Sequence, residues 1–410
     1  MAGWCGWCMV PVWLVLAMPG VACANETDAA ARAAEVQMQT EPAAPAAAQP
    51  APDVGTWHVR QVDGVDYVPL EDLRSFYKLM PMQPKGRKVA GQRLLGNGEV
   101  VLCFGPAPRE LRIQERLVML SYPVIEDASG DLLVSRQDVL QVVEPVLRPT
   151  YIANRRAVRT VVIDPGHGGH DTGAVTSYVR EADAVLVVAI KLGAELKKRG
   201  YEVVFTRDQN QYLSPQGRVD KANAAPLAVY VSLHLNSGRS DMKGAQVYTL
   251  APPTGDDKPL PGHEFNQSSM ALAVALQSAL VEKAGMEDGG CRRVYYSPLS
   301  SLRCPAAMVE MGFATNPEEG TRLNTEETQM KLASALAEGI EAFARVMNPA
   351  TTLQVQKAPV VEPPAPPAKV EPAPKKAEPA KKKTSTPRKK ATTRKPKRRS
   401  SSSSSRKRRR

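Results

Sequence analysis

The sequence predicts an α/β protein with a twisted, mostly parallel sheet flanked by helices. A small α+β domain precedes this fold, and a disordered basic tail follows it. Between residues 156 and 348, β-branched runs alternate with helical segments, a pattern typical of βαβ units. Residues 56–150 hold shorter strand-like runs and turn signals. Residues 349–410 are rich in proline, lysine and serine and are not expected to form a core.

The small domain begins with a hairpin signal. Residues 62–68 alternate in polarity around the turn pair Asp63-Gly64, and Pro69 ends the run. Further elements are expected as a helix over 70–77, strands over 100–104 and 117–120, and a helix over 135–140. This segment resembles the small domain found at the N terminus of copper amine oxidases and in many exported bacterial proteins. It holds no charged cluster suited to catalysis, so a binding or spacing role is expected.

The segment 161–173 organises the larger domain. A β-branched run over 161–163 stops at Asp164-Pro165 and continues as a loop in which His167 lies among glycines. Glycine permits positive φ and close backbone approach, and in α/β proteins sites are built at the C-terminal ends of strands. The loop is therefore a candidate metal or catalytic site. The alternative is a glycine-rich turn that carries a surface histidine.

The later elements of this domain follow from apolar spacing. Val185, Val188, Leu192 and Leu196 recur at helical spacing, and Gly200 ends that helix. The others are expected in this order: strand 201–206, helix 214–223, strand 227–234, strand 244–250, helix 266–283, strand 305–311 and helix 325–346.

The N-terminal segment indicates export. Residues 1–24 are interpreted as a signal peptide, because the apolar run 9–18 is too short to span a bilayer and precedes the A-x-A pattern Ala22-Cys23-Ala24. Residues 25–55 are rich in alanine and proline and are expected to be a flexible linker.

Three cysteines would remain after removal of the signal peptide, namely Cys103, Cys291 and Cys304. Their odd number and the lack of a CxxC pair among them indicate neither a disulfide framework nor a thiolate zinc site. A bridge between Cys291 and Cys304 is left open, since export would place the chain in an oxidising compartment.

The excess positive charge lies in the C-terminal tail. Residues 357–410 hold 20 Lys and Arg against 3 Asp and Glu, a net charge of +17, so the other residues carry −5 of the total of +12. Such a run attracts anionic polymers. Because the chain has an export signal and no nucleic-acid recognition motif, anionic envelope polymers or lipid headgroups are expected as partners rather than nucleic acid. A solvated spacer without a target is the alternative.

Two histidines and two glutamates lie on or beside the predicted strands. His167 follows the first strand, His234 ends a later one, Glu181 opens a helix, and Glu310 interrupts an apolar run. Singly, each has a structural explanation, such as the preference for glutamate in the first turn of a helix. Together, two imidazoles and one carboxylate have the composition of a catalytic zinc site with a position left for water. Glu310 would be costly as an unpaired core residue, and as a base it could accept a proton from that water.

Several motifs recur in order between about residue 159 and residue 343. They are the segments 162–169, 206–207, 218–223, 232–237 and 305–317, together with Glu181. In these motifs the chain resembles the zinc-dependent N-acetylmuramoyl-L-alanine amidases of type 3, the cell-separation amidases. The resemblance implies Zn²⁺ as cofactor, His167, Glu181 and His234 as its ligands, Glu310 as the catalytic glutamate and Asn236 near the substrate.

The same resemblance implies a function in the bacterial cell envelope. The expected reaction is hydrolysis of the amide bond between N-acetylmuramic acid and L-alanine of peptidoglycan, in the periplasm, for wall remodelling and daughter-cell separation. The resemblance is also compatible with an activator protein as a partner. Two alternatives stay open: another envelope zinc peptidase or amidohydrolase, and a non-catalytic cell-wall-binding protein.

Three positions differ from the family pattern or fall outside it. Leu235 replaces the small residue that often separates the second histidine from the asparagine. His170 matches no family ligand and is expected at the surface. Residues 250–266 are too few to hold the inhibitory helix that regulated relatives carry there, so no such helix is expected.

Overall fold

The computed structural model describes residues 57–83, 92–98, 100–105, 108–152, 154–253 and 259–348. The predicted signal peptide, linker and basic tail (1–24, 25–55 and 349–410) lie outside these residues. No helix in the described ranges has the length and apolar content needed to cross a membrane.

The predicted hairpin is present at the start of the small domain. Strands β1 (Arg60–Val62) and β2 (Val65–Pro69) pair antiparallel. The two turn residues, Asp63 and Gly64, have φ values of 49° and 77°, as a two-residue turn with the twist of a hairpin requires. Helix α1 (Leu70–Phe76) follows directly. Strands β8 (Ile125–Glu126) and β9 (Leu132–Ser135) complete a four-stranded sheet in the order β1-β2-β9-β8.

A second set of antiparallel strands follows in the same domain. It comprises β3 (Met80–Pro81), β4 (Arg93–Gly96), β5 (Val101–Phe104), β6 (Glu110–Ile113) and β7 (Arg116–Met119). The helical end of the domain is α2 (Arg136–Asp138), a π-helical turn (Val139–Val143), α3 (Glu144–Leu147) and a 3₁₀ turn (Pro149–Tyr151). Strands β5 and β7 were predicted. Strands β3, β4 and β6 were not predicted, because they contain no run of β-branched residues.

The larger domain is built on a six-stranded region in the order β11-β10-β12-β15-β13-β14. The bounds are β10 (Thr160–Pro165), β11 (Glu202–Phe205), β12 (Ala228–Asn236), β13 (Ala245–Leu250), β14 (Asp288–Val294) and β15 (Ala306–Phe313). All neighbouring pairs are parallel except β13 and β15, which confirms the predicted mostly parallel sheet. Strand β14 was not predicted, because glycines and arginines replace an apolar run there.

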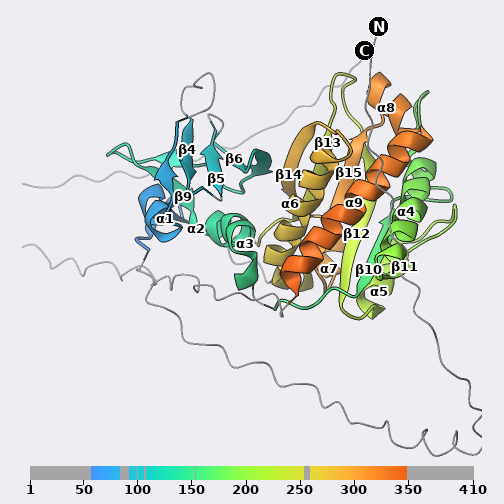
Figure 1. Ribbon diagram of the computed structural model, residues 1–410, viewed down its shortest axis with the longest axis horizontal. Helices are drawn as coiled ribbons and strands as arrows, with labels where there is room; N and C mark the ends of the chain where they lie inside the picture. The colour runs from blue at the N-terminus through green and yellow to red at the C-terminus, as the bar shows by residue number, and fades with distance from the viewer. Residues whose placement is uncertain are drawn as a thin grey trace, which may run out of the picture. The chain divides into compact units, whose positions relative to one another are not determined.

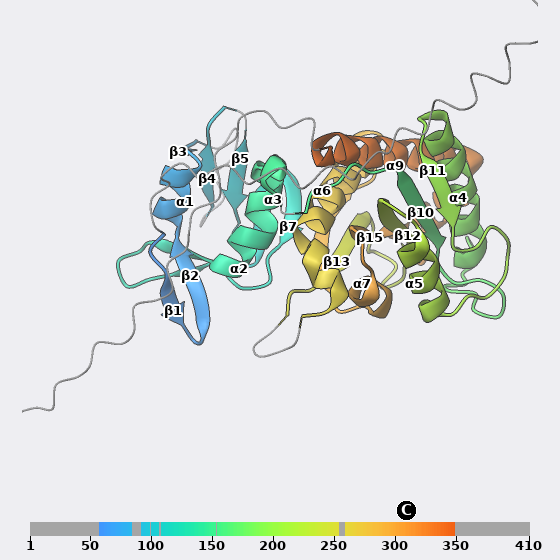
Figure 2. The same cartoon turned by 90° about the horizontal axis from the view of Figure 1, so that it is seen from below.

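Helices cover both faces of this sheet. Figure 1 shows α4 (Glu181–Lys198), α6 (Asn266–Glu282) and α9 (Glu326–Met347) across one face. In Figure 2, α5 (Pro215–Ala224) and α7 (Ser297–Ser301) lie on the other side of the strands from α9. A further short helix, α8 (Pro317–Leu323), follows β15.

Strand β12 shows how the two faces differ. Val231 and Leu233 point into the core beneath α4 and α9, whereas Tyr230 packs in a second cluster with residues of α5 and α7. Because side chains alternate along a strand, His234 and Asn236 lie on the same face as Tyr230. The polar residues at the C-terminal end of β12 therefore share one face of the sheet.

The sheet continues from the larger domain into the small one. Strand β7 runs parallel to β14, with Val118 opposite Cys291, and strands β3 to β7 extend the same sheet. The backbone N–H of Leu117 also donates to a carboxylate oxygen of Asp288 at 2.9 Å.

The three cysteines of the described chain are buried and free. The bridge between Cys291 and Cys304 that the sequence left open is thus not formed. Burial raises the pKa of the Cys304 thiol to about 12, so this group stays protonated at neutral pH.

Candidate metal centre

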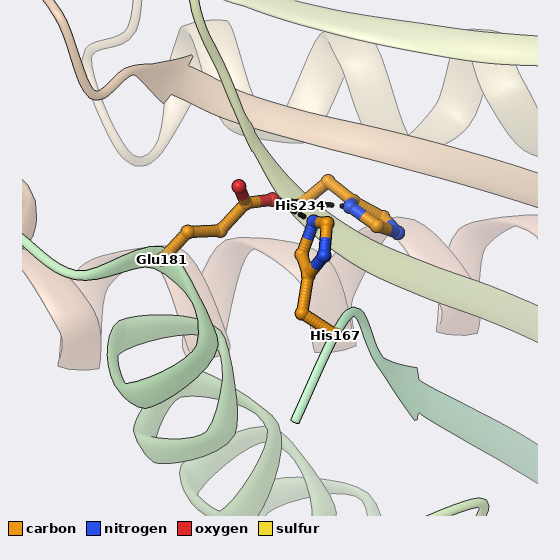
Figure 3. Close-up of side chains that lie close together, drawn as sticks. All are labelled: His167, Glu181 and His234. Atoms are coloured by element: carbon orange, nitrogen blue, oxygen red, sulfur yellow. Dashed lines mark hydrogen bonds and ion pairs between the residues drawn. The ribbon is translucent and has the colours of Figure 1, made fainter. Parts of the chain in front are cut away.

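Three candidate ligands from distant parts of the sequence meet at one point. Their ligand atoms, from His167, Glu181 and His234, all lie within 4.8 Å of one another. The Nε2 atom of His167 is 3.0 Å from Oε1 of Glu181, and Nδ1 of His234 is 3.1 Å from the same oxygen. Figure 3 shows the side chains pointing toward one another from the loop after β10, the start of α4 and strand β12.

The loop after β10 has a backbone that brings His167 into this cluster. His167 itself has a φ of 59°, a left-handed conformation that costs a non-glycine residue about 1 kcal/mol. A Cβ atom on Gly166 would lie 2.3 Å from Cε1 of His234, and one on Gly173 would lie 2.5 Å from Oε2 of Glu181. Both glycines are therefore needed for the close approach of the loop to the ligands.

Two buried arginines hold the carbonyl groups of this loop. Arg207 donates from Nη2 to the carbonyl oxygen of Gly166 at 2.7 Å. Arg218 donates from Nη2 to the carbonyl oxygen of His167 at 2.8 Å and from Nη1 to Oδ1 of buried Asp164 at 2.6 Å. Charge-assisted hydrogen bonds of this kind fix the loop geometry, so Arg218 supports the loop rather than acting on a ligand.

Asp171 supports the first histidine and was missed by the sequence analysis. Its Oδ1 atom is 2.9 Å from Nδ1 of His167. This contact orients the ring so that Nε2 faces Glu181, as supporting carboxylates commonly do for metal-binding histidines. The hydrogen bond to Glu181, with a smaller contribution from Asp171, raises the pKa of His167. The spacing of four residues within a loop gave no signal that distinguished Asp171 from other acidic residues.

Glu181 is buried and ionised in this cluster. Its Oε2 atom accepts the backbone N–H of Ala174 at 2.8 Å, and its Oε1 atom accepts that of Leu235 at 3.0 Å. Burial by itself would raise the pKa of Glu181, but the hydrogen bonds to the two imidazoles and to Ala174 outweigh it and hold the pKa well below the usual value. Two nitrogen donors and one anionic oxygen are thus available to a cation.

Glu310 lies beside the cluster of candidate ligands. It is opposite His234 in the register of β12 and β15, so the two side chains are neighbours on one face of the sheet. Its Oε2 atom is buried and has no hydrogen-bond partner among the residues that the structure describes. Burial is the main cause that raises the pKa of Glu310 to about 7. A carboxyl group that titrates near neutral pH can both accept and donate a proton.

Comparison with known proteins assigns a family to this architecture. Residues 161–342 match the family model described as N-acetylmuramoyl-L-alanine amidase (Amidase_3). The Bacillus subtilis protein YqiI is 32% identical over 185 residues, which cover 45% of this chain and 84% of YqiI. The chain belongs to the N-acetylmuramoyl-L-alanine amidase family.

Two other relatives of this amidase match the same region. The protein named probable cell wall amidase LytH, from Staphylococcus aureus, is 29% identical over 189 residues, which cover 45% of this chain and 58% of LytH. The chain thus spans little more than half of LytH. The crystal structure of N-acetylmuramoyl-L-alanine amidase from Clostridium difficile 630 has 30% identity and a TM-score of 0.41, and covers 46% of this chain and 97% of that one.

The residues of the amidase cluster suit a zinc ion. Two imidazole nitrogens and one carboxylate oxygen are the donor types of catalytic zinc sites, in which three protein ligands leave one position free. The pair of hydrogen bonds from His167 and His234 to one oxygen of Glu181 draws these donors together. Within the described part of the chain, Oε2 of Glu310 has no hydrogen-bond partner, which is expected of a group that acts on a bound ligand.

Asn236, predicted near the substrate, lies at the end of β12 within a short polar network. Its Nδ2 atom donates to Oε1 of Gln246 at 3.0 Å, and the hydroxyl of Tyr248 donates to the same oxygen at 2.7 Å. Gln246 lies opposite Glu310 across β13 and β15. Gln246 could not be singled out from the sequence, because the antiparallel pairing that places it opposite Glu310 depends on the fold.

Two further predictions concern His170 and the region 250–266. His170 is exposed, as predicted, and its ring lies on that of Tyr212 at a centroid distance of 4.2 Å. In the region expected to lack an inhibitory helix, residues 254–258 are outside the described part of the chain. A 3₁₀ turn (Pro261–Phe265) forms in the remainder, and the absence of an inhibitory helix stays a prediction.

Removal of the supporting carboxylate should weaken metal binding. In Asp171→Ala, the ring of His167 loses the partner that fixes its orientation, so affinity for zinc is expected to fall by about 10–100-fold. Competition with a chelating dye measures the change. Asp220→Ala, an exposed carboxylate on α5, is the matched control. Equal affinities for the Asp171 and Asp220 variants would contradict the supporting role.

The raised pKa of Glu310 also predicts a dependence of stability on pH. Its pKa of about 7 in the folded protein lies above the ordinary value of 4.5, so ionisation opposes folding as pH rises from 4.5 to 7, and the cost is complete above 7. Glu310→Gln should therefore stabilise the metal-free protein by about 2–3 kcal/mol more at pH 8 than at pH 5. Urea unfolding in the presence of a chelator tests this, with Glu318→Gln on the surface as control. The same effect of Glu310→Gln at both pH values would refute the prediction.

Proposed function

We propose that this protein is a zinc-dependent amidase that hydrolyses the bond between N-acetylmuramic acid and the L-alanine of the peptidoglycan stem peptide. The observation that carries the proposal is the meeting of His167, Glu181 and His234 beside the unpartnered oxygen of Glu310. The cluster lies in a chain of the N-acetylmuramoyl-L-alanine amidase family. The names of the relatives support the choice of bond and of polymer.

Each residue of the site has a distinct task in this proposal. His167, Glu181 and His234 would hold the zinc ion, which when bound polarises the carbonyl group of the substrate and acidifies water. Glu310 accepts a proton on its buried carboxylate from the attacking water and returns it to the nitrogen of L-alanine as that amine leaves. Asp171 keeps Nε2 of His167 directed toward the ligand cluster. Asn236 and Gln246 form the polar wall next to Glu310, where an amide of the substrate can pair with them.

The same proposal places the protein in the cell envelope. Peptidoglycan lies outside the cytoplasm, so a chain that acts on it requires export, and the signal-like segment 1–24 is consistent with that requirement. We extend the proposal to a periplasmic location and to a contribution to wall remodelling and daughter-cell separation. An activator protein and an anionic partner of the basic tail stay predictions from the sequence.

Digestion of purified peptidoglycan tests the function. The full-length protein with zinc is expected to release intact stem peptides and to leave N-acetylmuramic acid with a free lactyl carboxylate, as mass spectrometry of the products would show. A chelator should stop the release, and added zinc should restore it. Products cut within the stem peptide would instead indicate an envelope peptidase. The absence of any cleavage by zinc-loaded protein would favour a wall-binding protein.

A further inference from the structure

A cavity of about 550 Å³ is lined by arginines from both domains. We call it the arginine cavity. Its lining includes Arg109, Ser121 and Tyr122 of the small domain and Tyr248, Pro252 and Arg292 of the larger domain. The family model begins at residue 161, so the first three of these residues lie outside the matched region. None of the residues assigned to zinc or to proton transfer lines this cavity.

The arginine cavity is on the catalytic face of the sheet. Gln246 is opposite Glu310, and Tyr248, two residues further along β13, is opposite Arg292 on β14. Alternate residues of a strand and opposite residues of paired strands share a face, so all four side chains are on the same side. The hydroxyl of Tyr248 donates to Gln246, and the Tyr248 side chain therefore joins the cavity to the polar wall of the site.

Arg109 and Arg292 bring positive charge to the lining of the cavity. Among the residues that the structure describes, no carboxylate forms an ion pair with Arg109 or Arg292. Arg292 uses its Nε atom to donate to the carbonyl oxygen of Gly289 at 3.1 Å, which leaves its terminal nitrogens for a ligand. Arg293 differs, because it donates to the side chain and backbone of Gln141 and so supports the structure.

The spacing between the cavity and Glu310 fits the peptide side of the substrate. Two strand spacings, about 10 Å, separate β15 from β14. Two residues of extended peptide span about 7 Å, and an arginine side chain covers the rest. Arginine is suited to carboxylates, with which it makes two parallel hydrogen bonds. We propose that the arginine cavity binds the free α-carboxylate of the stem-peptide residue that follows L-alanine, an inference that rests on the proposed function.

A pair of ligands that differ in one group tests the proposal. N-acetylmuramoyl-L-alanyl-D-glutamic acid has a free α-carboxylate on the residue after L-alanine, whereas the isoglutamine form has a neutral amide at that position. Both compounds keep the same free γ-carboxylate. Both are titrated by calorimetry into zinc-loaded, full-length protein with Glu310→Gln, which should not consume them. The acid is expected to bind at least about 10-fold more tightly than the amide, because hydrogen bonds to charged groups are the stronger ones.

Variants of the two arginines then locate the effect. Arg109→Gln with Arg292→Gln in the same background should bring the affinity ratio of acid to amide close to one. Arg292→Lys keeps the positive charge and should retain part of the preference for the acid. If the variants acted only through the lost hydrogen bond to Gly289, the affinities for both ligands would fall by the same factor. Arg345→Gln, an exposed residue of α9, is the matched control and should keep the full ratio.

The results that would overturn the inference are separate from those that would overturn the function. An affinity ratio near one in the parent, no binding of either ligand at millimolar concentration, or a ratio unchanged by the double variant each rejects the arginine cavity as the carboxylate site. If the double variant does not fold, as judged by circular dichroism, Arg109→Gln alone decides, since Arg109 is exposed. Failure of the wild-type protein to cleave peptidoglycan would reject the proposed function, and the affinity ratio would still decide the carboxylate site.

Discussion

Glu310→Gln is expected to reduce the amidase rate by at least about 10²–10⁴-fold and to leave zinc bound. The amide retains the size of the side chain but cannot accept a proton from water. The three candidate ligands are unchanged in this variant, because Glu310 is not part of the cluster in which the ligand atoms lie within 4.8 Å of one another. Rates on soluble muropeptides and the metal content of the purified protein measure the two effects.

The control for this prediction is another glutamate that is outside the site. Glu318→Gln, on the exposed side of α8, should retain both rate and zinc. If Glu310→Gln loses zinc together with activity, Glu310 is a ligand and the assignment of ligand and base must be exchanged. A rate that stays close to that of the unmodified protein would reject Glu310 as the proton acceptor.

His167→Ala should lose both zinc and activity. The variant removes one of three donors and leaves Glu181 with one imidazole partner. The loss of affinity should exceed the 10–100-fold that removal of a supporting residue costs, because a ligand itself is missing. Metal analysis after dialysis and rates measured at several zinc concentrations would show whether added zinc restores activity.

His170→Ala is the matched control for His167→Ala. The two histidines are three residues apart in the same loop, but His170 is exposed and contacts the ring of Tyr212. Its removal should leave the zinc content unchanged. Zinc retained by His167→Ala, or equal losses from both variants, would contradict the proposed ligand set.

The sequence determined the elements whose own residues fix their structure. The β-branched start of β10 and the apolar spacing of α4 depend on local pattern, and both elements were predicted to within a few residues. Glu310 was also identifiable, since a carboxylate within an apolar strand requires a reason. The motifs around the two histidines were sufficient to indicate the family, because their residue types and order follow from the chemistry of the site.

Only the tertiary structure decided which distant residues meet. The antiparallel pairing of β13 with β15 brings Gln246 opposite Glu310, and the left-handed backbone of His167 brings its ring to Asp171 and Glu181. Strand β14 and its junction with β7 were likewise absent from the predictions. The opposite residues Val118 and Cys291 are 173 positions apart in the sequence, and their pairing does not depend on a local apolar run. Local sequence pattern specifies single helices and strands, whereas strand order and register depend on burial in the whole fold. Strand order and register are what assemble the candidate site and the arginine cavity.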